Sequence, residues 1–184
     1  ALFAASSYDG VSAATPLDLF RQNSGMLFDG LMTSKAEMAG VIAGRGWDMV
    51  NLAFLAGGLW LLRQRIFTWH APAGMLAALS VCALIGFDEG SSTGGGSILF
   101  HLFSGATMFG AFFIITDPVS SAVSNKGRLI FGALVGVLVY LIRVYGNYPD
   151  ALAFGVLLMN FAAPLIDQYT QPVVYGTKKI EVDE

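Results

Sequence analysis

Five apolar segments, each followed by a short polar stretch, make up most of the chain from residue 47 onward. They span residues 47–62, 71–87, 97–116, 129–145 and 151–166. Several are shorter than the ~20 residues that a perpendicular membrane span needs, but tryptophan and tyrosine flank them, as these rings do at membrane interfaces. Buried helices of soluble proteins are also apolar, yet five such runs within 120 residues favour a membrane bundle. The pattern predicts an all-α integral membrane protein with about five transmembrane helices.

The first 46 residues have a different pattern. Charged residues and glycines interrupt their short apolar clusters, so we expect an extramembrane segment that lies partly on the bilayer surface. The sequence thus predicts three parts: an outer-face segment of residues 1–46, a five-helix transmembrane domain of residues 47–168 and a cytoplasmic tail of residues 169–184.

Composition supports the membrane class. Hydrophobic residues make up 55% of the chain, charged residues make up 12%, about half the share in soluble domains, and the mean hydropathy is +0.63. A formal net charge of -3 without a basic stripe gives no reason to expect nucleic acid, so lipid is the expected surrounding. Cys82 is the single cysteine, which excludes a disulfide within the chain. The chain begins at Ala1 without a signal-peptide pattern, and we expect it to be a fragment of a longer protein.

Lysine and arginine set the predicted orientation. Five spans would place six basic residues on the side of the C-terminal tail and four on the opposite side. The six are Arg63, Arg65, Lys126, Arg128, Lys178 and Lys179, and the four are Arg21, Lys35, Arg45 and Arg143. Because basic loops tend to stay in the cytoplasm, we expect a cytoplasmic C-terminus and an outer-face location for residues 1–46.

The candidate chemistry lies in residues 9–17, which read DGVSAATPL. Pro16 disfavours the helical conformation for Thr15 and is a common first helical residue, so Thr15 is expected to be extended and to cap a short helix. A phosphate esterified to Thr15 would face the free N–H groups of that helix. An ordinary helix cap accounts for the same residues, and the local pattern alone leaves both interpretations open.

The spacing of Asp9, Ser12, Ala13, Ala14 and Thr15 resembles the motif on which a flavin transferase attaches FMN to threonine through a phosphoester. Alanine stands at position 13 where glycine is usual, and it is nearly as small. The resemblance implies that Thr15 carries covalent FMN and that the other four residues belong to the attachment motif.

A second stretch, Ser104-Gly105-Ala106-Thr107, is a closer textual match, but we expect it to carry no flavin. About ten residues into a continuous third helix, at ~1.5 Å per residue, Thr107 would lie near the middle of the bilayer, where a water-soluble transferase could not reach it. We interpret these small residues, like Gly132 and Gly136 with their GxxxG spacing, as positions of close helix packing. A flavin ring or quinone held beside this helix would also need small residues.

Other polar residues in the apolar segments are weaker candidates. His101 could be a ligand or proton relay, but a single histidine makes no metal site, which favours a packed, hydrogen-bonded role. Asp117 in Thr116-Asp117-Pro118 belongs either to an ion path or to an ordinary helix stop. Asn51, Asn160 and Asp167 are expected to form interhelical hydrogen bonds. The sequence contains no recognisable catalytic triad, Walker loop or zinc cluster.

Long stretches of the chain resemble one family of membrane proteins. They are residues 9–17, 46–53 (GWDMVNLA), 101–121 (HLFSGATMFGAFFIITDPVSS), 125–132 (NKGRLIFG), 148–150 (YPD) and 160–176. Together they resemble the C-terminal half of the D subunit of Rnf complexes, a family related to the B subunit of the sodium-pumping NADH:quinone reductase.

The resemblance implies a subunit of the bacterial inner membrane whose family fold has two similar five-helix halves, of which this chain would be the second. The complex moves electrons between ferredoxin and NAD and couples this to ion translocation, so the chain would not be catalytic by itself. Family precedent places covalent FMN on the threonine of the periplasmic face, here Thr15. The expected partners are the other Rnf subunits, including a second FMN-bearing subunit, and the flavin transferase. Sodium-pumping relatives also carry riboflavin, for which the sequence offers no motif.

Two other functions stay open. Small-residue helices with buried asparagine, histidine and aspartate also suit half of a permease or channel without a redox role. A membrane anchor for other subunits is the third interpretation. The absence of a catalytic acid or base agrees with the flavin hypothesis, because flavin supplies the redox chemistry while the protein supplies attachment and position.

Overall fold

The computed structural model describes residue 17 and residues 46–87, 97–146, 148 and 150–170. Every regular element in these ranges is a helix, and they contain no strand. The elements are α3 (Trp47–Arg63), α4 (His70–Ile85), α5 (Ile98–Phe103), α6 (Thr107–Phe109), the π-helical turn η3 (Gly110–Ile114), α7 (Asn125–Tyr145) and α8 (Leu152–Thr170). The prediction of an all-α fold is confirmed for the described part of the chain.

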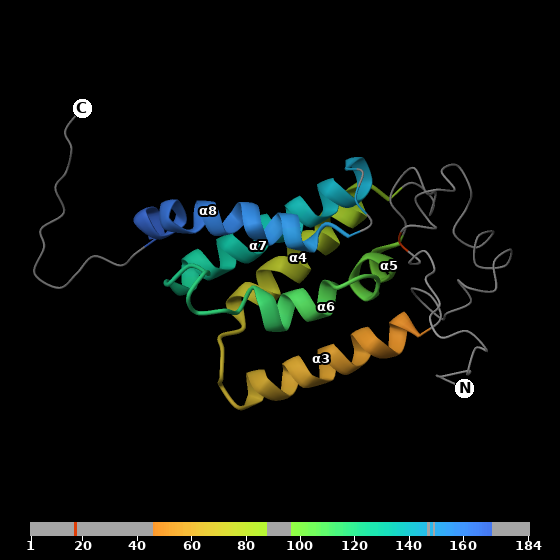
Figure 1. The fold of residues 1–184 in the computed structure, drawn as a ribbon, viewed down its shortest axis with the longest axis horizontal. Helices are drawn as coiled ribbons and strands as arrows, with labels where there is room; N and C mark the ends of the chain where they lie inside the picture. The colour runs from red at the N-terminus through yellow and green to blue at the C-terminus, as the bar shows by residue number, and fades with distance from the viewer. Residues whose placement is uncertain (1–16, 18–45, 88–96, 147, 149, 171–184) are drawn as a thin grey trace, which may run out of the picture.

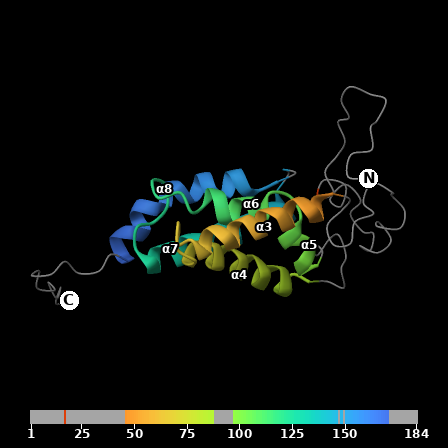
Figure 2. The same cartoon turned by 90° about the horizontal axis from the view of Figure 1, so that it is seen from below.

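The helices form an elongated bundle with their axes roughly along one direction (Figures 1 and 2). α7 packs along α4 on one side and along α8 on the other. α3 lies on the far side of the segment that contains α5, α6 and η3, and contacts all three of these short elements. The beginning of α3 and the end of α8 therefore lie at opposite ends of the bundle (Figure 1).

Glycine permits the close approach of α4 and α7. A Cβ atom added to Gly132 would collide with the backbone oxygen of Ala71, and one added to Gly136 would collide with that of Met75. The prediction that the GxxxG spacing marks close helix packing is confirmed at these two positions. Large apolar side chains complete the contact, and Phe131, Met75, Leu79, Val135 and Val139 are fully buried there.

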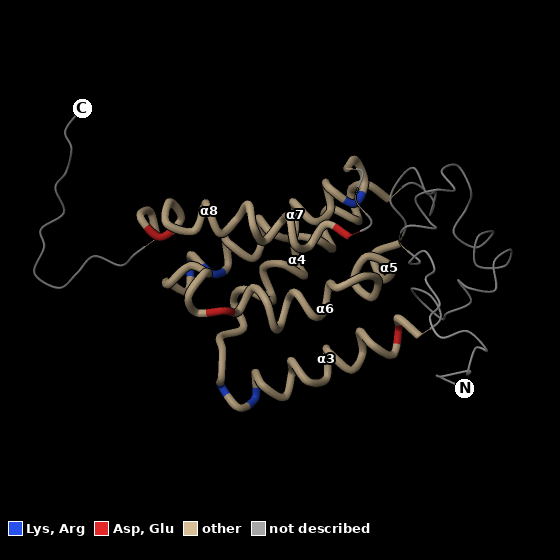
Figure 3. Tube along the Cα trace, viewed as in Figure 1, with Lys and Arg blue, Asp and Glu red and all other residues tan. Residues whose placement is uncertain are grey.

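Helix length and charge distribution both agree with a membrane protein. α7, with 21 residues, and α8, with 19, are the two described helices long and apolar enough to cross a membrane by length and composition, and α4 is a shorter apolar helix. Charged residues of the described helices gather at the two ends of the bundle, and the middle carries none (Figure 3). The count of five spans stays a prediction.

The third apolar segment differs from the expected continuous helix. α5 ends at Phe103, the chain is irregular at residues 104–106, and α6 and η3 then continue to Ile114. Gly105 has a positive φ of 59°, a conformation that glycine adopts without a steric penalty and that interrupts a right-handed helix. The break frees backbone carbonyl and N–H groups, and side chains of other helices bind them instead.

Candidate functional site

The predicted flavin-attachment residues, Asp9, Ser12, Ala13, Ala14 and Thr15, lie outside the described residues. The structure instead places a buried polar cluster around the helix break at residues 104–106. We call this cluster the helix-break site; it consists of Asn51, Ser104, Gly105, Thr107, Arg143 and Asp150 together with the backbone of His101.

Arg143 is at the centre of the helix-break site. It belongs to the last turn of α7, is only 6% exposed, and points its guanidinium group at the break. Nη1 donates to the carbonyl oxygen of His101 (2.8 Å), and Nη2 donates to the Thr107 hydroxyl (2.9 Å) and the Ser104 carbonyl oxygen (3.3 Å). One buried cation thus binds three of the acceptors that the interrupted helix presents.

Asp150 neutralises this cation from the segment before α8. Its Oδ1 accepts from Nη2 of Arg143 at 3.3 Å, and its Oδ2 accepts from the backbone N–H of Ala106 at 2.9 Å. The Asp150 side chain is 32% exposed and that of Arg143 is 1% exposed, so this ion pair lies at the edge of the bundle. The carboxylate therefore joins the break to the end of α7 and to the segment before α8.

Asn51 connects α3 to the same break. Its Nδ2 donates to the carbonyl oxygens of Phe103 (2.8 Å) and Gly105 (3.1 Å), and its Oδ1 lies 3.4 Å from the N–H of Met108. The side chain is 1% exposed. The prediction that Asn51 forms interhelical hydrogen bonds is confirmed, and the amide satisfies both donors and acceptors that the break leaves open.

Thr107 is fully buried, and its hydroxyl hydrogen is shared between the carbonyl oxygens of His101 and Ser104, at 2.9 Å each. The expected location near the middle of a continuous helix is not observed, because Thr107 follows the helix break and lies beside Arg143 in the last turn of α7. That Thr107 carries no flavin stays a prediction. Gly105 lies in a left-handed turn (φ 59°) rather than in a continuous helix, and the site is tightly packed, since an added Cβ would lie 2.9 Å from the Asp150 carboxylate.

The other predicted polar residues fall in different places. His101 is buried and packs its ring 5.5 Å from that of Tyr140, in agreement with the packed role. Asp117 follows η3 as an exposed turn residue that binds Ser120, in agreement with a helix stop. Asp167 accepts from the backbone N–H of Val123 (2.8 Å), a bond to a loop rather than to a helix. Asn160 Oδ1 is buried with no hydrogen-bond partner in the described ranges, so its expected interhelical bond is not observed.

The side chains of the helix-break site have a structural role. The acceptors at the break are occupied by donors of Asn51 and Arg143, and a guanidinium group that is always charged cannot act as an acid or base near neutral pH. Among the described residues, no group of three histidine, cysteine, aspartate or glutamate side chains could hold a metal ion. We therefore assign this site to holding the broken helix against α3, α7 and α8.

Sequence reasoning missed the two ionic members of this site. The sequence presents Arg143 only as a charge on the outer side, and Asp150 only as part of a resemblance. A signal is nevertheless present, since an arginine near the end of an apolar span that also contains Gly132 and Gly136 calls for an acceptor set inside the bundle. The location of those acceptors could not be predicted without knowing that the third helix breaks.

Comparison with known proteins agrees with the resemblance of the sequence. The sequence model of the NQR2, RnfD, RnfE family matches residues 2–176. The chain is 56% identical over 180 residues to the D subunit of the ion-translocating oxidoreductase complex of Cellvibrio japonicus, covering 97% of this chain and 51% of the relative. It is 57% identical over 175 residues to that of Ectopseudomonas mendocina (95% and 51%) and 53% identical over 171 residues to that of Yersinia pseudotuberculosis (93% and 48%). The chain spans about half the length of these curated relatives.

Proposed function

Because the chain belongs to the NQR2, RnfD, RnfE family, we propose that it is part of a membrane subunit of an Rnf-type ion-translocating electron-transport complex. The observation that carries this proposal is the identity of more than half to D subunits of ion-translocating oxidoreductase complexes, over more than nine-tenths of this chain. The charge-free middle of the bundle agrees with a location in lipid. In this role the subunit relays electrons between ferredoxin-linked and NAD-linked partners.

Five passes across the inner membrane complete the proposed topology: α3, α4, the broken third segment, α7 and α8. The end of the bundle that contains Arg63, Arg65, Lys126 and Arg128 faces the cytoplasm, since basic residues concentrate on that side. The start of α3 then faces the periplasm, which places residues 1–46 on the outer side.

The electron carrier in this proposal is FMN bound covalently to Thr15. The spacing from Asp9 to Thr15 matches the attachment motif except at Ala13, and the outer-face location puts the hydroxyl within reach of a soluble flavin transferase. The flavin supplies one- and two-electron chemistry, and the helices hold it at a fixed place beside a second FMN-bearing subunit. A bound riboflavin, as in sodium-pumping relatives, would be an additional carrier.

Flavin fluorescence in a denaturing gel tests this assignment. The complete subunit, co-expressed with the transferase, should fluoresce, and Thr15→Val should abolish the signal because valine has the shape of threonine without the hydroxyl. Thr33→Val is the matched control, since it alters another threonine of the same outer segment and should leave the band bright. Ala13→Gly restores the usual motif and should keep or increase the fluorescence.

The same gel separates the flavin carrier from a permease or channel. A broken transmembrane helix often lines a solute site, and the break at residues 104–106 is the observation that favours this second function. A dark band for the unaltered subunit in the presence of active transferase would support it. A fluorescent band that persists in Thr15→Val would place the flavin on another residue, which mass spectrometry of the tryptic peptides would identify.

A further inference from the structure

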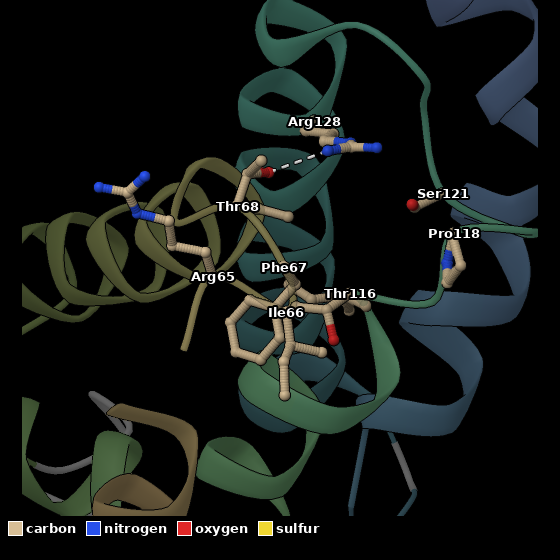
Figure 4. Close-up of a pocket in the computed structure, with 10 residues that line it drawn as sticks. Arg65, Ile66, Phe67, Thr68, Thr116, Pro118, Ser121 and Arg128 are labelled. Atoms are coloured by element: carbon tan, nitrogen blue, oxygen red, sulfur yellow. Dashed lines mark hydrogen bonds between the residues drawn. The ribbon is translucent and has the colours of Figure 1, made fainter. Parts of the chain in front are cut away.

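A second polar site lies at the end of the bundle opposite to the helix-break site. It is a cavity of about 150 Å³ between the α3–α4 loop, the segment after η3 and the first turn of α7 (Figure 4). This volume is far above the roughly 15 Å³ that admits one water molecule, so a small oxyanion fits. The polar lining residues are Arg65, Thr68, Thr116, Ser121 and Arg128, and Ile66, Phe67 and Ile115 line the apolar side. The Arg65 guanidinium points away from the cavity, and the Thr116 hydroxyl donates to the carbonyl oxygen of Phe112, which leaves Thr68, Ser121 and Arg128 to face a ligand.

Arg128 is held in place while most of its donors remain open. Nε donates to the carbonyl oxygen of Ala122 (3.1 Å), and Nη1 donates to the Thr68 hydroxyl (3.0 Å). These two bonds use two of the five N–H groups of a guanidinium, and the other three bind no described residue. No described carboxylate forms an ion pair with Arg128 either. A guanidinium that is fixed and has no ion pair among the described residues is suited to a planar contact with two oxygens of an anion.

Two hydroxyl groups lie beside this guanidinium. Thr68 accepts from Arg128, so its own hydrogen remains available for donation to a ligand. Ser121 is 8% exposed, and its hydroxyl faces the same space as the guanidinium, next to Pro118 (Figure 4). The cavity therefore gathers one cation and two hydroxyl donors, a combination that binds the oxygens of a phosphate group.

The surroundings add a positive potential. Arg63, Arg65 and Lys126 are exposed at the same end of the bundle, and the guanidinium of Arg65 points outward from the cavity rim (Figure 4). The two described acidic residues at this end are engaged with the chain itself, Asp117 with Ser120 and Asp167 with the N–H of Val123. Among the described residues at this end, four basic side chains stand against two acidic ones, a balance that attracts anions.

The residues around the cavity are those expected at the headgroup region of a membrane. Trp69, adjacent to Thr68, is 54% exposed and stacks on His70 at 4.3 Å, and exposed tryptophan is typical of the headgroup region. Ile66 lines the cavity and is 66% exposed, so an apolar surface continues from the polar pocket toward the outside of the bundle. A ligand with a charged head and an apolar tail would match both surfaces.

We propose that this cavity binds a phosphate group, with the Arg128 guanidinium and the Ser121 and Thr68 hydroxyls as donors. The group comes either from the headgroup of an anionic phospholipid or from a small soluble phosphate compound. The site is independent of the flavin proposed for Thr15, and it lies at the other end of the bundle from the start of α3.

A thermal-shift titration of the complete purified subunit in neutral detergent tests the site. Two probes are used separately: inorganic phosphate, and a short-chain phosphatidylglycerol below its micelle concentration. Arg128→Gln should weaken binding of the active probe about tenfold, the effect of losing one hydrogen bond to a charged group. Arg63→Gln is the matched control, because Arg63 is exposed at the same end but does not line the cavity, and it should change the affinity less than about twofold. Ser121→Ala, a milder change, should weaken binding severalfold even if Arg128→Gln does not fold.

The results assign the source of the phosphate or overturn the site. Stabilisation by phosphatidylglycerol alone identifies a lipid headgroup, and stabilisation by inorganic phosphate with the same dependence on Arg128 identifies a soluble phosphate compound. Equal weakening by Arg128→Gln and Arg63→Gln would show only general attraction to a basic surface and would overturn the proposal. So would the absence of binding by both probes, or an unchanged affinity in Ser121→Ala.

Discussion

The two arginines of α7 show how one residue type can serve opposite purposes at the two ends of one helix. Arg143, in the last turn, is buried, paired with Asp150 and bonded to three groups of the broken third segment. Arg128, in the first turn, is half-buried, bonded to Thr68 and Ala122, and leaves three N–H groups toward a cavity. Arginine is suited to both roles because its charge is permanent and its donors are arranged in a rigid plane. The difference is decided by the acceptors that the surrounding backbone provides.

At the Arg143 end, a broken helix supplies the acceptors. Gly105 turns the chain out of the helix, so the carbonyl oxygens of His101 and Ser104 face the guanidinium rather than the next helical turn. At the Arg128 end, the neighbouring helices have regular ends that satisfy their own groups. α3 ends with the N–H of Arg65 bound to the oxygen of Leu62 and that of Ile66 bound to the oxygen of Leu61, the pattern of a Schellman motif. Arg143 therefore uses its donors within the fold, whereas Arg128 keeps three N–H groups available for a ligand.

The largest expected effect comes from removing each arginine in turn. Arg143→Met should lower the free energy of unfolding by about 3–5 kcal/mol, because the change leaves the Asp150 carboxylate and several buried acceptors without their cation. Arg128→Met should cost less than about 1 kcal/mol, as is typical of a charge near the surface. Thermal unfolding of both variants in detergent measures the difference. Similar losses for the two variants would contradict the division into a locking and a binding arginine.

Gly105 and Gly46 share a left-handed backbone conformation but differ in what surrounds them. Gly105 (φ 59°) and Gly46 (φ 88°) both have positive φ, but an added Cβ has nothing within 4 Å at Gly46 and lies 2.9 Å from Asp150 Oδ2 at Gly105. Gly46→Ala should cost only the backbone penalty of about 1–2 kcal/mol. Gly105→Ala should cost about 1–2 kcal/mol more, because the carboxylate must move away from Ala106 and Arg143. The same unfolding measurement tests both, and equal costs would show that the Asp150 contact contributes nothing.

The general fold was predictable from the sequence because it depends on composition and period. Apolar segments separated by polar stretches predicted helices, and the GxxxG spacing of Gly132 and Gly136 predicted close helix packing, which the structure shows between α4 and α7. Each of these signals is local in the chain. These local signals do not show which end of the bundle faces the cytoplasm, so that orientation rests on the distribution of basic residues alone.

The helix-break site could not be predicted, because it depends on partners far apart in the sequence. Ser104-Gly105-Ala106-Thr107 fits a packing stripe equally well, and only the positive φ of Gly105 separates a break from a continuous helix. The donors that stabilise the break come from α3 and α7, 52 and 42 residues away for the Asn51–Phe103 and His101–Arg143 bonds. Local propensity contains no information about such pairs, so Arg143 and Asp150 appear in the sequence only as charges beside a span.

The smallest effect is expected at the exposed turn of Asp117 and Ser120, which lies at the Arg128 end of the bundle. A change of pH in this turn tests whether the two ends of α7 respond independently. The Ser120 hydroxyl (2.8 Å) and N–H (3.1 Å) donate to Oδ2 of Asp117, and the hydroxyl bond holds the pKa of this exposed carboxyl below its ordinary value of 3.8. Since the folded-state pKa is depressed, the stabilisation is present above the ordinary pKa and is lost as the pH falls through the depressed one. Ser120→Ala removes the hydroxyl bond and keeps the N–H bond, so the pKa of Asp117 should rise part of the way toward 3.8.

Titration of the Asp117 carboxyl carbon by NMR in detergent measures this shift. Ser80→Ala is the control, because the Ser80 hydroxyl binds the carbonyl oxygen of Leu76 within α4 and has no contact with the turn. At each pH, the bonds from Arg143 to the His101 oxygen and the Thr107 hydroxyl should be the same in Ser120→Ala as in the unaltered protein, since they involve none of the turn residues. A difference in these Arg143 contacts between Ser120→Ala and the unaltered protein at the same pH would mean that the two ends of α7 are coupled, and would contradict their separate roles.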